Sequence, residues 1–190
     1  MARTARITKE HILDAAVALV RELGPDALNA RSLAARLSCS TQPIFKNYAS
    51  MQAVLDAVMA YAEGLYTQGI KQEIEKAGYP PYKASGIGYI RFAMNEPQLF
   101  KLLFMRDRTN EDQKKPTAEY EQELSIVMQQ NGLTHAQAEQ FHLSMWIFVH
   151  GIAVMLATGY LLLSPDQISA LLTENYLALQ KQFSEKEEDK

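Results

Sequence analysis

Apolar residues recur at intervals of three and four along most of the chain, which is the spacing of one face of an α-helix. The first such stretch follows Thr8, a residue type that caps helices, and stops at Gly24-Pro25. Its apolar stripe consists of Ile12, Ala16, Leu19, Val20 and Leu23. The pattern therefore predicts an amphipathic helix between Thr8 and Gly24.

Capping signals predict where the other helices begin. The next three helices and their N-caps are 30–37 behind Asn29, 41–47 behind Ser40, and 51–77 behind Ser50. Further helices are expected at 83–95, 97–107, 117–131, 135–163 and 165–184. The last two open with the capping boxes Thr134 to Gln137 and Ser164 to Gln167. No stretch alternates like a strand, so the sequence predicts an all-α protein of about nine helices.

The composition of the chain indicates the cellular compartment in which the protein is expected. The 190 residues are 47% apolar, which is enough for a packed core. A single cysteine forms no internal disulfide and fits a reducing compartment. The opening residues MARTARITKEH have no apolar run behind them, so they do not form a secretory signal. We therefore expect a cytoplasmic protein.

The charges are distributed unevenly along the chain. Residues 1–48 carry seven Lys and Arg against four acids, a net charge of +3. The remainder carries twelve against eighteen, a net charge of −6. A basic head on an acidic body indicates that only the head meets a polyanion such as nucleic acid.

The head also carries the spacing of a helix-turn-helix. Its two short helices are separated by residues 38–40, and in this motif the second helix enters the DNA major groove by its N-terminal end. Gln42 can pair with adenine, and Thr41 can hydrogen-bond a base or touch a thymine methyl. Pro43 stiffens the reading edge, and Lys46 can reach a phosphate. The inner face of this helix, Ile44 and Tyr48, is expected to pack on Leu33 and Leu37, with Cys39 as a small buried spacer.

Residues 8–55 resemble the DNA-binding domain of the TetR/AcrR (tetracycline-repressor-like) family. The likeness lies in "ILDAAVALVRELGPDALNARSLAARL" and in "CSTQPIFKNYASMQAVLDAV". It implies that Arg31 contacts the groove or a phosphate, and that Thr41, Gln42 and Pro43 read bases. The full set of expected DNA contacts is Arg31, Ser40, Thr41, Gln42, Pro43, Phe45, Lys46, Asn47 and Ser50.

Three positions depart from the pattern of that family. Phe45 replaces a usual tyrosine, so a contact through that hydroxyl is lost. Ser38 replaces the usual turn glycine, which costs on the order of 1 kcal/mol if its φ is positive. Met51 replaces a phosphate-binding lysine, although the free N–H groups behind Ser50 can still hold a phosphate.

The C-terminal half resembles the ligand-binding, dimerising half of the same family more loosely. The segments "YIRFAMNEPQLFKLLF" and "WIFVHGIA" look like a subgroup marked by Trp-x-x-x-His-Gly, here Trp146, His150 and Gly151. The resemblance implies a homodimer built on the last two helices and an effector cavity among the middle ones. The expected pocket residues are Phe92, Phe100, Phe104, Trp146 and His150. Whether His150 contacts ligand or lies hydrogen-bonded in the core stays open.

Helical periodicity independently favours a dimer. A stripe on the final helix and a seam on the helix before it are too long to be buried wholly within a small body. Two such helices from each subunit would form a four-helix bundle. The expected interface residues are Phe148, Ile152, Met155, Ile168, Leu172, Tyr176 and Leu179.

Two alternatives concern the helix expected at 135–163. Residues 140–165 contain no Asp, Glu, Lys or Arg, a length that can span a membrane, but no basic cluster flanks them. His135, Glu139 and His142 fall near one face of this helix, and one helix rarely completes a metal shell. A membrane-anchored or metal-responsive helix-turn-helix regulator is therefore the alternative hypothesis, while no membrane contact, metal or other cofactor is expected.

The sequence as a whole predicts two domains, a DNA-binding one at 1–50 and an effector-binding, dimerising one at 51–190. We expect a homodimeric repressor that a small, largely apolar effector releases from a palindromic operator on double-stranded DNA. No catalytic triad, phosphate loop or carboxylate pair is present, so an enzyme is not expected. Gly64 and Gly69 inside the long helix indicate either close packing or a compliant point.

Overall fold

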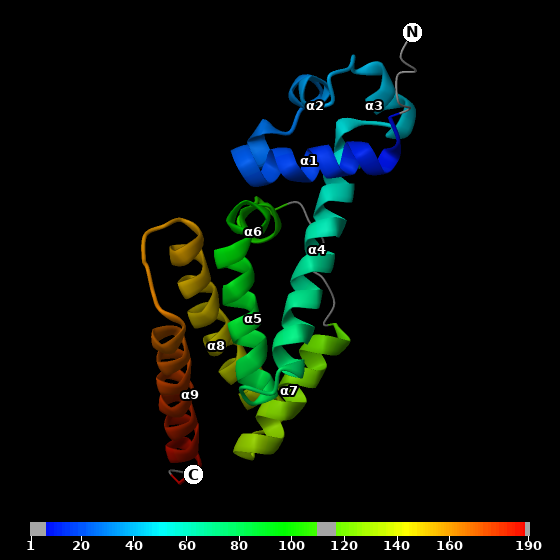
Figure 1. Ribbon diagram of the computed structural model, residues 1–190. Helices are drawn as coiled ribbons and strands as arrows, with labels where there is room; N and C mark the ends of the chain where they lie inside the picture. The colour runs from blue at the N-terminus through cyan, green and yellow to red at the C-terminus, as the bar shows by residue number, and fades with distance from the viewer. Residues whose placement is uncertain (1–6, 110–116, 189–190) are drawn as a thin grey trace. The chain divides into compact units, whose positions relative to one another are not determined.

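The computed structural model describes residues 7–109 and 117–188, and this part of the chain is almost wholly helical (Figure 1). The helices are α1 (Lys9–Leu23), α2 (Ala30–Arg36), α3 (Gln42–Asn47), α4 (Met51–Glu75), α5 (Pro81–Asn95), α6 (Pro97–Phe104), α7 (Ala118–Asn131), α8 (His135–Ala157) and α9 (Pro165–Glu188). One 3-10 turn, Pro25–Ala27, follows α1. The described residues contain no strand, so the all-α prediction is confirmed.

Most of the predicted helix caps are present. Thr8, Asn29 and Ser50 each accept a hydrogen bond through the side chain from a backbone N–H in the first turn of α1, α2 and α4. Thr134 forms the predicted capping box of α8, and Ser164 pairs with Gln167 in the same way at α9. These short-range signals are reliable because donor and acceptor lie within three residues of each other.

Several predicted helix boundaries differ from those in the structure, and two of the differences change the interpretation. The residue before α3 is Thr41, which has helical dihedral angles and makes no side-chain cap, so Ser40 is not the N-cap. The predicted helix 135–163 ends at Ala157, because the chain turns at Gly159 with a φ of 71°. A left-handed turn suits glycine, which has no Cβ to clash there. The apolar residues after Gly159 therefore belong to a loop.

The helices form two compact units. Unit 1 comprises Met1–Thr67 with Asn95–Arg106, and unit 2 comprises Gln68–Met94 with Asp107–Lys190. The helix α4 contributes its first part to unit 1 and its last turns to unit 2. The division at residue 50 that the sequence indicates for the functional domains stays a prediction.

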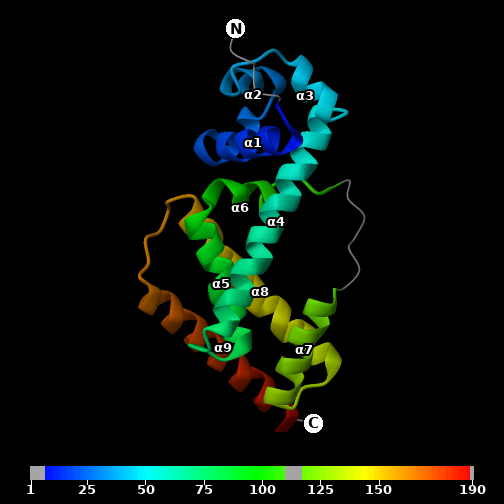
Figure 2. The ribbon, with the colours of Figure 1, turned by 45° about the vertical axis from the view of Figure 1, so that its right-hand side comes forward.

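The core of unit 1 forms where α1 packs against α2, α3 and α6 (Figure 2). Ile12 and Val20 of α1, Leu33 of α2 and Ile44 of α3 are all fully buried. Arg21 at the end of α1 also forms an ion pair of 2.6 Å with Glu96 at the start of α6. The amphipathic face predicted for α1 is thus the face that joins the unit together.

The core of unit 2 combines apolar packing with buried polar pairs. Its largest cluster consists of Tyr82, Leu124, Val127, Leu133, Ala138, Phe141, Met145 and Phe183. Within it the Tyr82 hydroxyl lies 3.0 Å from Nδ1 of His142, and burial lowers the pKa of His142. At its edge Tyr176 of α9 bonds with Asn131 of α7 at 2.9 Å. These polar pairs satisfy groups that would otherwise be costly to bury.

The last turns of α4 pack very closely against α5 within unit 2. A Cβ added at Gly88 would lie only 3.0 Å from the Cα of Ile70, so glycine is required for this approach. One turn further on, the buried carboxylate of Glu73 binds Arg91 of α5 and Lys76, the residue directly after α4. The C-terminal end of α4 is therefore held firmly in unit 2.

Gly64 and Gly69, by contrast, are not close-packed. A Cβ added at either position would meet nothing within 4 Å, so the close-packing explanation is wrong. The two glycines lie on either side of the border between the units, at Thr67–Gln68. A compliant point in α4 remains a prediction for these residues.

Replacing these two glycines should stabilise the protein. Gly64→Ala and Gly69→Ala should each raise the free energy of unfolding by about 0.5–1 kcal/mol, because alanine favours a helix and no neighbour obstructs its methyl group. Chemical denaturation measures the change. Gly88→Ala is the matched control and should lower the free energy of unfolding, since its methyl group would meet the backbone of α4. If Gly64→Ala and Gly69→Ala lowered the free energy of unfolding instead, the two glycines would have a packing role after all.

Ser38 stands at the turn position where a glycine is usual, and it adopts a positive φ there. Its φ is 51°, in the left-handed region, so Ser38→Gly should raise the free energy of unfolding by about 1 kcal/mol. The neighbouring Ser40→Gly is the control, because Ser40 does not have a positive φ and should gain nothing. Thermal melts of both variants would contradict this if Ser38→Gly were no more stable than Ser40→Gly.

Candidate nucleic-acid interface and effector region

The helices α2 and α3 follow each other across a short turn, and both pack against α1. Ile44 of α3 is fully buried, and Tyr48, directly after α3, is 5% exposed, so both face the inside of unit 1. Their packing on Leu33 and Leu37 stays a prediction. The Tyr48 hydroxyl donates to the carbonyl of Lys9 at 3.4 Å, and the Lys9 ammonium lies 5.0 Å from the centre of the Tyr48 ring. This arrangement fixes α3 against α1 and leaves its other face to solvent.

The outer face carries most of the residues predicted to contact DNA. Gln42, Phe45 and Lys46 are exposed on α3, and so are Arg31, Ser40 and Ser50 around it. Thr41, Pro43 and Asn47 are half-buried. Most of the predicted contact residues are thus exposed in unit 1, and their binding to DNA stays a prediction.

Asn47 differs from the other predicted contacts. Its amide nitrogen donates to the carbonyl of Pro43 at 2.8 Å and to that of Ile7 at 3.4 Å. Both bonds tie α3 to its own first turn and to the segment before α1. Asn47 therefore holds the helix in place, and it is less suited to read a base.

The cations of the head divide into paired and unpaired groups. Arg36 binds Glu22 at 2.6 Å, and this bond lowers the pKa of Glu22. Arg21 is likewise paired with Glu96. Within the part of the chain that the structure describes, Arg31 and Lys46 have no carboxylate within ion-pair distance. Arg31 lies on α2 and Lys46 on α3, and both are exposed, so both are available to an anion.

Cys39 lies in the turn between α2 and α3. It is a free thiol and is half-buried, not buried as the sequence interpretation had it. Its backbone N–H donates to the carbonyl of Ala34 at 3.0 Å and so helps to close the turn.

The residues predicted to line an effector pocket come from both units. In unit 1 the rings of Phe100 and Phe104 lie 5.1 Å apart, and Phe100 is fully buried. In unit 2 Phe92 is buried, while Trp146 lies parallel to His150 at 5.1 Å. The pocket built from all five stays a prediction.

His150 itself is a hydrogen-bonded residue. Its Nδ1 lies 2.8 Å from the Tyr89 hydroxyl, and burial lowers its pKa, with a smaller contribution from the charge of Arg108. Trp146 on the other side of the imidazole is 46% exposed. The two residues of the Trp-x-x-x-His-Gly signature therefore form one aromatic stack on α8.

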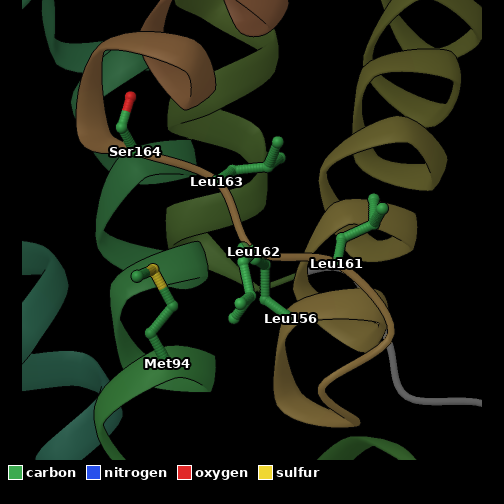
Figure 3. Close-up of a pocket in the computed structure, with 6 residues that line it drawn as sticks. All are labelled: Met94, Leu156, Leu161, Leu162, Leu163 and Ser164. Carbon is green, nitrogen blue, oxygen red and sulfur yellow. The ribbon is translucent and has the colours of Figure 1, made fainter.

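Unit 2 also contains an apolar hollow that the sequence did not indicate (Figure 3). It has a volume of about 330 Å³ and is lined by Met94, Leu156, Leu161, Leu162, Leu163 and Ser164. The only hydroxyl among these residues, on Ser164, already accepts a bond from the N–H of Gln167. The hollow arises where α8 ends early, so a prediction that continued this helix to residue 163 could not find it.

The predicted dimer stripe needs correction. Ile152, Ile168 and Leu172 are at most 4% exposed within a single chain, so their side chains are not available to a second subunit. Phe148, Met155, Tyr176 and Leu179 are half-buried, and the last two pack against the core cluster of unit 2. Helical periodicity identified a buried face correctly but could not tell which protein chain buries it.

Other apolar residues on the same helices remain exposed. On α8 these are Leu143 at 54% and Ile147 at 58%, one turn apart, and on α9 Leu177 is 54% exposed. Large exposed aliphatic side chains at helical spacing are typical of a surface that a partner covers.

The structure bears on both alternatives for α8. By length and composition α8 could cross a membrane, although the core helix of a soluble protein passes the same test. Among the described residues no group of three or more His, Cys, Asp or Glu could hold a metal ion. His135 lies 3.6 Å from Glu121 and 3.7 Å from Glu139, whereas His142 faces Tyr82. The three residues of the alternative metal site thus do not form such a group.

Comparison of the chain with known proteins shows the family to which it belongs. No curated protein matches the chain. A solved structure, described as a protein with unknown function from Rhodococcus sp. RHA1, has a similar fold, with a TM-score of 0.65 at 19% sequence identity. The match covers 96% of this chain and 98% of that one. A family model described as "Tetracyclin repressor-like, C-terminal domain" matches residues 82–178. Since these residues make up about half of the 190, the chain belongs to the tetracyclin repressor-like family.

Proposed function

We propose that this protein is a ligand-responsive, DNA-binding transcriptional regulator, and that it acts as a homodimeric repressor. The observation that carries the proposal is the surface of α3, which is locked from inside by Ile44 and Tyr48 and presents exposed Gln42 and Lys46 outward. A short helix held in this way is suited to insertion into a DNA groove. Membership of the tetracyclin repressor-like family supports a regulatory role.

Base reading and phosphate binding fall to different residues in this proposal. Gln42 lies at the N-terminal end of α3, where its amide can pair with the N6 and N7 atoms of adenine. Lys46 and Arg31 have no competing carboxylate among the described residues, so they are free to neutralise phosphates and release counterions. Arg36 and Arg21 are already paired and should contribute little.

A second copy of the chain is the proposed occupant of the exposed face on α8 and α9. Leu143, Ile147 and Leu177 would be buried there, and two helices from each subunit would form a four-helix bundle. A two-fold dimer presents two heads, which must match half-sites about 34–36 Å apart, or one turn of DNA. We therefore propose a palindromic operator.

The proposed release mechanism acts through α4. Its last turns are held in unit 2 by the Gly88 contact and by the pairing of Glu73 with Arg91, while its first part belongs to unit 1. A small, largely apolar effector that binds near the Trp146 and His150 stack in unit 2 would shift these turns. Gly64 and Gly69 lower the resistance of α4 to bending at the border between the units.

Because Gln42 and Lys46 have different proposed roles, their substitution should produce different defects in DNA binding. Gln42→Ala should weaken operator binding by about 1–3 kcal/mol and relax the preference at one base pair, because a bidentate contact is lost. Lys46→Ala should weaken specific and random DNA alike and flatten the salt dependence by about one phosphate per half-site. Fluorescence anisotropy at several salt concentrations measures both. If Gln42→Ala lost affinity equally on operator and random DNA, Gln42 would not be a reader.

The dimer proposal predicts which surface charges separate the subunits. The double substitution Leu143→Glu and Ile147→Glu should give monomers, because unpaired charge would have to be buried in the interface. Operator affinity should fall with it, since one head makes half of the phosphate contacts. Analytical ultracentrifugation measures the mass. Leu23→Glu is the matched control at a 67% exposed leucine of α1 and should remain dimeric. A double variant that stays dimeric would move the interface elsewhere.

A further inference from the structure

Phe45 is the one large apolar side chain on the outer face of α3. It is 47% exposed, with Gln42 three residues before it and Lys46 directly after it. Ile44, its other neighbour, is fully buried and holds the helix in unit 1. About half of the Phe45 ring is therefore open to solvent, on the same helix as the proposed readers, while Ile44 supplies the fully buried contact of α3.

The major groove of DNA offers few partners to such a ring. The base edges there display hydrogen-bond donors and acceptors, with one apolar exception, the C5-methyl group of thymine. Covering apolar surface is favourable, whereas pressing a phenyl ring onto unpaired donors or acceptors is costly. An apolar side chain on the reading face therefore favours A·T pairs whose methyl group points at it.

We propose that Phe45 is a specificity-determining residue that contacts the methyl group of a thymine in each half-site. The inference rests on the proposed function, since it requires α3 to enter the major groove. Three residues of a helix rise about 4.5 Å, and base pairs are stacked about 3.4 Å apart. The thymine should therefore lie within one or two base pairs of the base that Gln42 reads.

The main competing contact for Phe45 is the sugar-phosphate backbone. A ring laid on deoxyribose would add affinity for any sequence and would not distinguish thymine from uracil. On α3, Lys46 is better suited to bind the phosphates, because it is exposed and positively charged. Removing a single thymine methyl group from the DNA should lower the affinity if Phe45 contacts that group, and should leave the affinity unchanged if Phe45 contacts deoxyribose.

The test uses the full-length protein and an operator selected from random DNA. Each thymine of that operator is replaced in turn by deoxyuridine, which lacks the C5-methyl group and keeps every hydrogen-bonding group. At one position per half-site, this replacement should lower the affinity about fourfold, because burying one methyl-sized group is worth about 0.8 kcal/mol. Replacing the thymine in both half-sites should lower the affinity about 16-fold. Substitutions at the other thymines should have little effect.

Protein variants show whether Phe45 detects the methyl group. Phe45→Ala should lower affinity for the thymine operator and abolish the difference between thymine and uracil at the sensitive position. Phe45→Leu should keep that difference, because it retains an apolar side chain. Leu23→Ala, at an exposed leucine on α1, is the matched control and should change neither affinity nor the difference. Circular dichroism checks that the variants fold, as expected for an exposed position.

Three results would overturn the inference. The first is a selected half-site without thymine near the base read by Gln42. The second is an operator on which no uracil substitution changes the affinity. The third is a Phe45→Ala variant that keeps the full thymine-to-uracil difference. Selection that enriches no sequence at all would reject the proposed function together with this inference, whereas the three results above reject only the role of Phe45.

Discussion

The close contact between α4 and α5 at Gly88 is the interaction on which the regulatory half of the molecule depends. Because Gly88 has no side chain, Ile70 of α4 approaches the α5 backbone directly, and Glu73 then pairs with Arg91 one turn later. The last turns of α4 are therefore packed directly against the backbone of α5. The same helix contributes its first part to unit 1, and the proposed release mechanism rests on this continuity of α4.

In the head, the pairing of charges decides which basic residues are available for the proposed DNA contacts. A count of basic residues predicts an anion-binding surface, but Arg21 and Arg36 are engaged by Glu96 and Glu22. Arg31 on α2 and Lys46 on α3 have no such partner in the described part of the chain, and α3 is the helix that carries the proposed reader Gln42. The small set of free cations, not the net charge, defines the proposed phosphate contacts.

The sequence predicted local features well and features of mutual packing less well. Caps such as Thr134 and Asn29 were found because their partners lie within three residues. The end of α8 was missed because apolar periodicity continues past Gly159, where the backbone turns. The burial of Leu172 was foreseen, but the sequence could not show that its own chain covers it. Gly64 and Gly88 look alike in sequence, and only the coordinates show that one is open and the other close-packed.

Selection of DNA from a random pool by the purified full-length protein tests the central claim most directly. The account predicts a single enriched motif that is palindromic, with half-sites whose centres are one helical turn, or 10–10.5 base pairs, apart. Binding to that motif should exceed binding to random DNA of the same length by at least about a thousandfold at physiological salt. Recovery of no motif, or of equal affinity for motif and random DNA, would contradict the claim that this protein is a sequence-specific regulator.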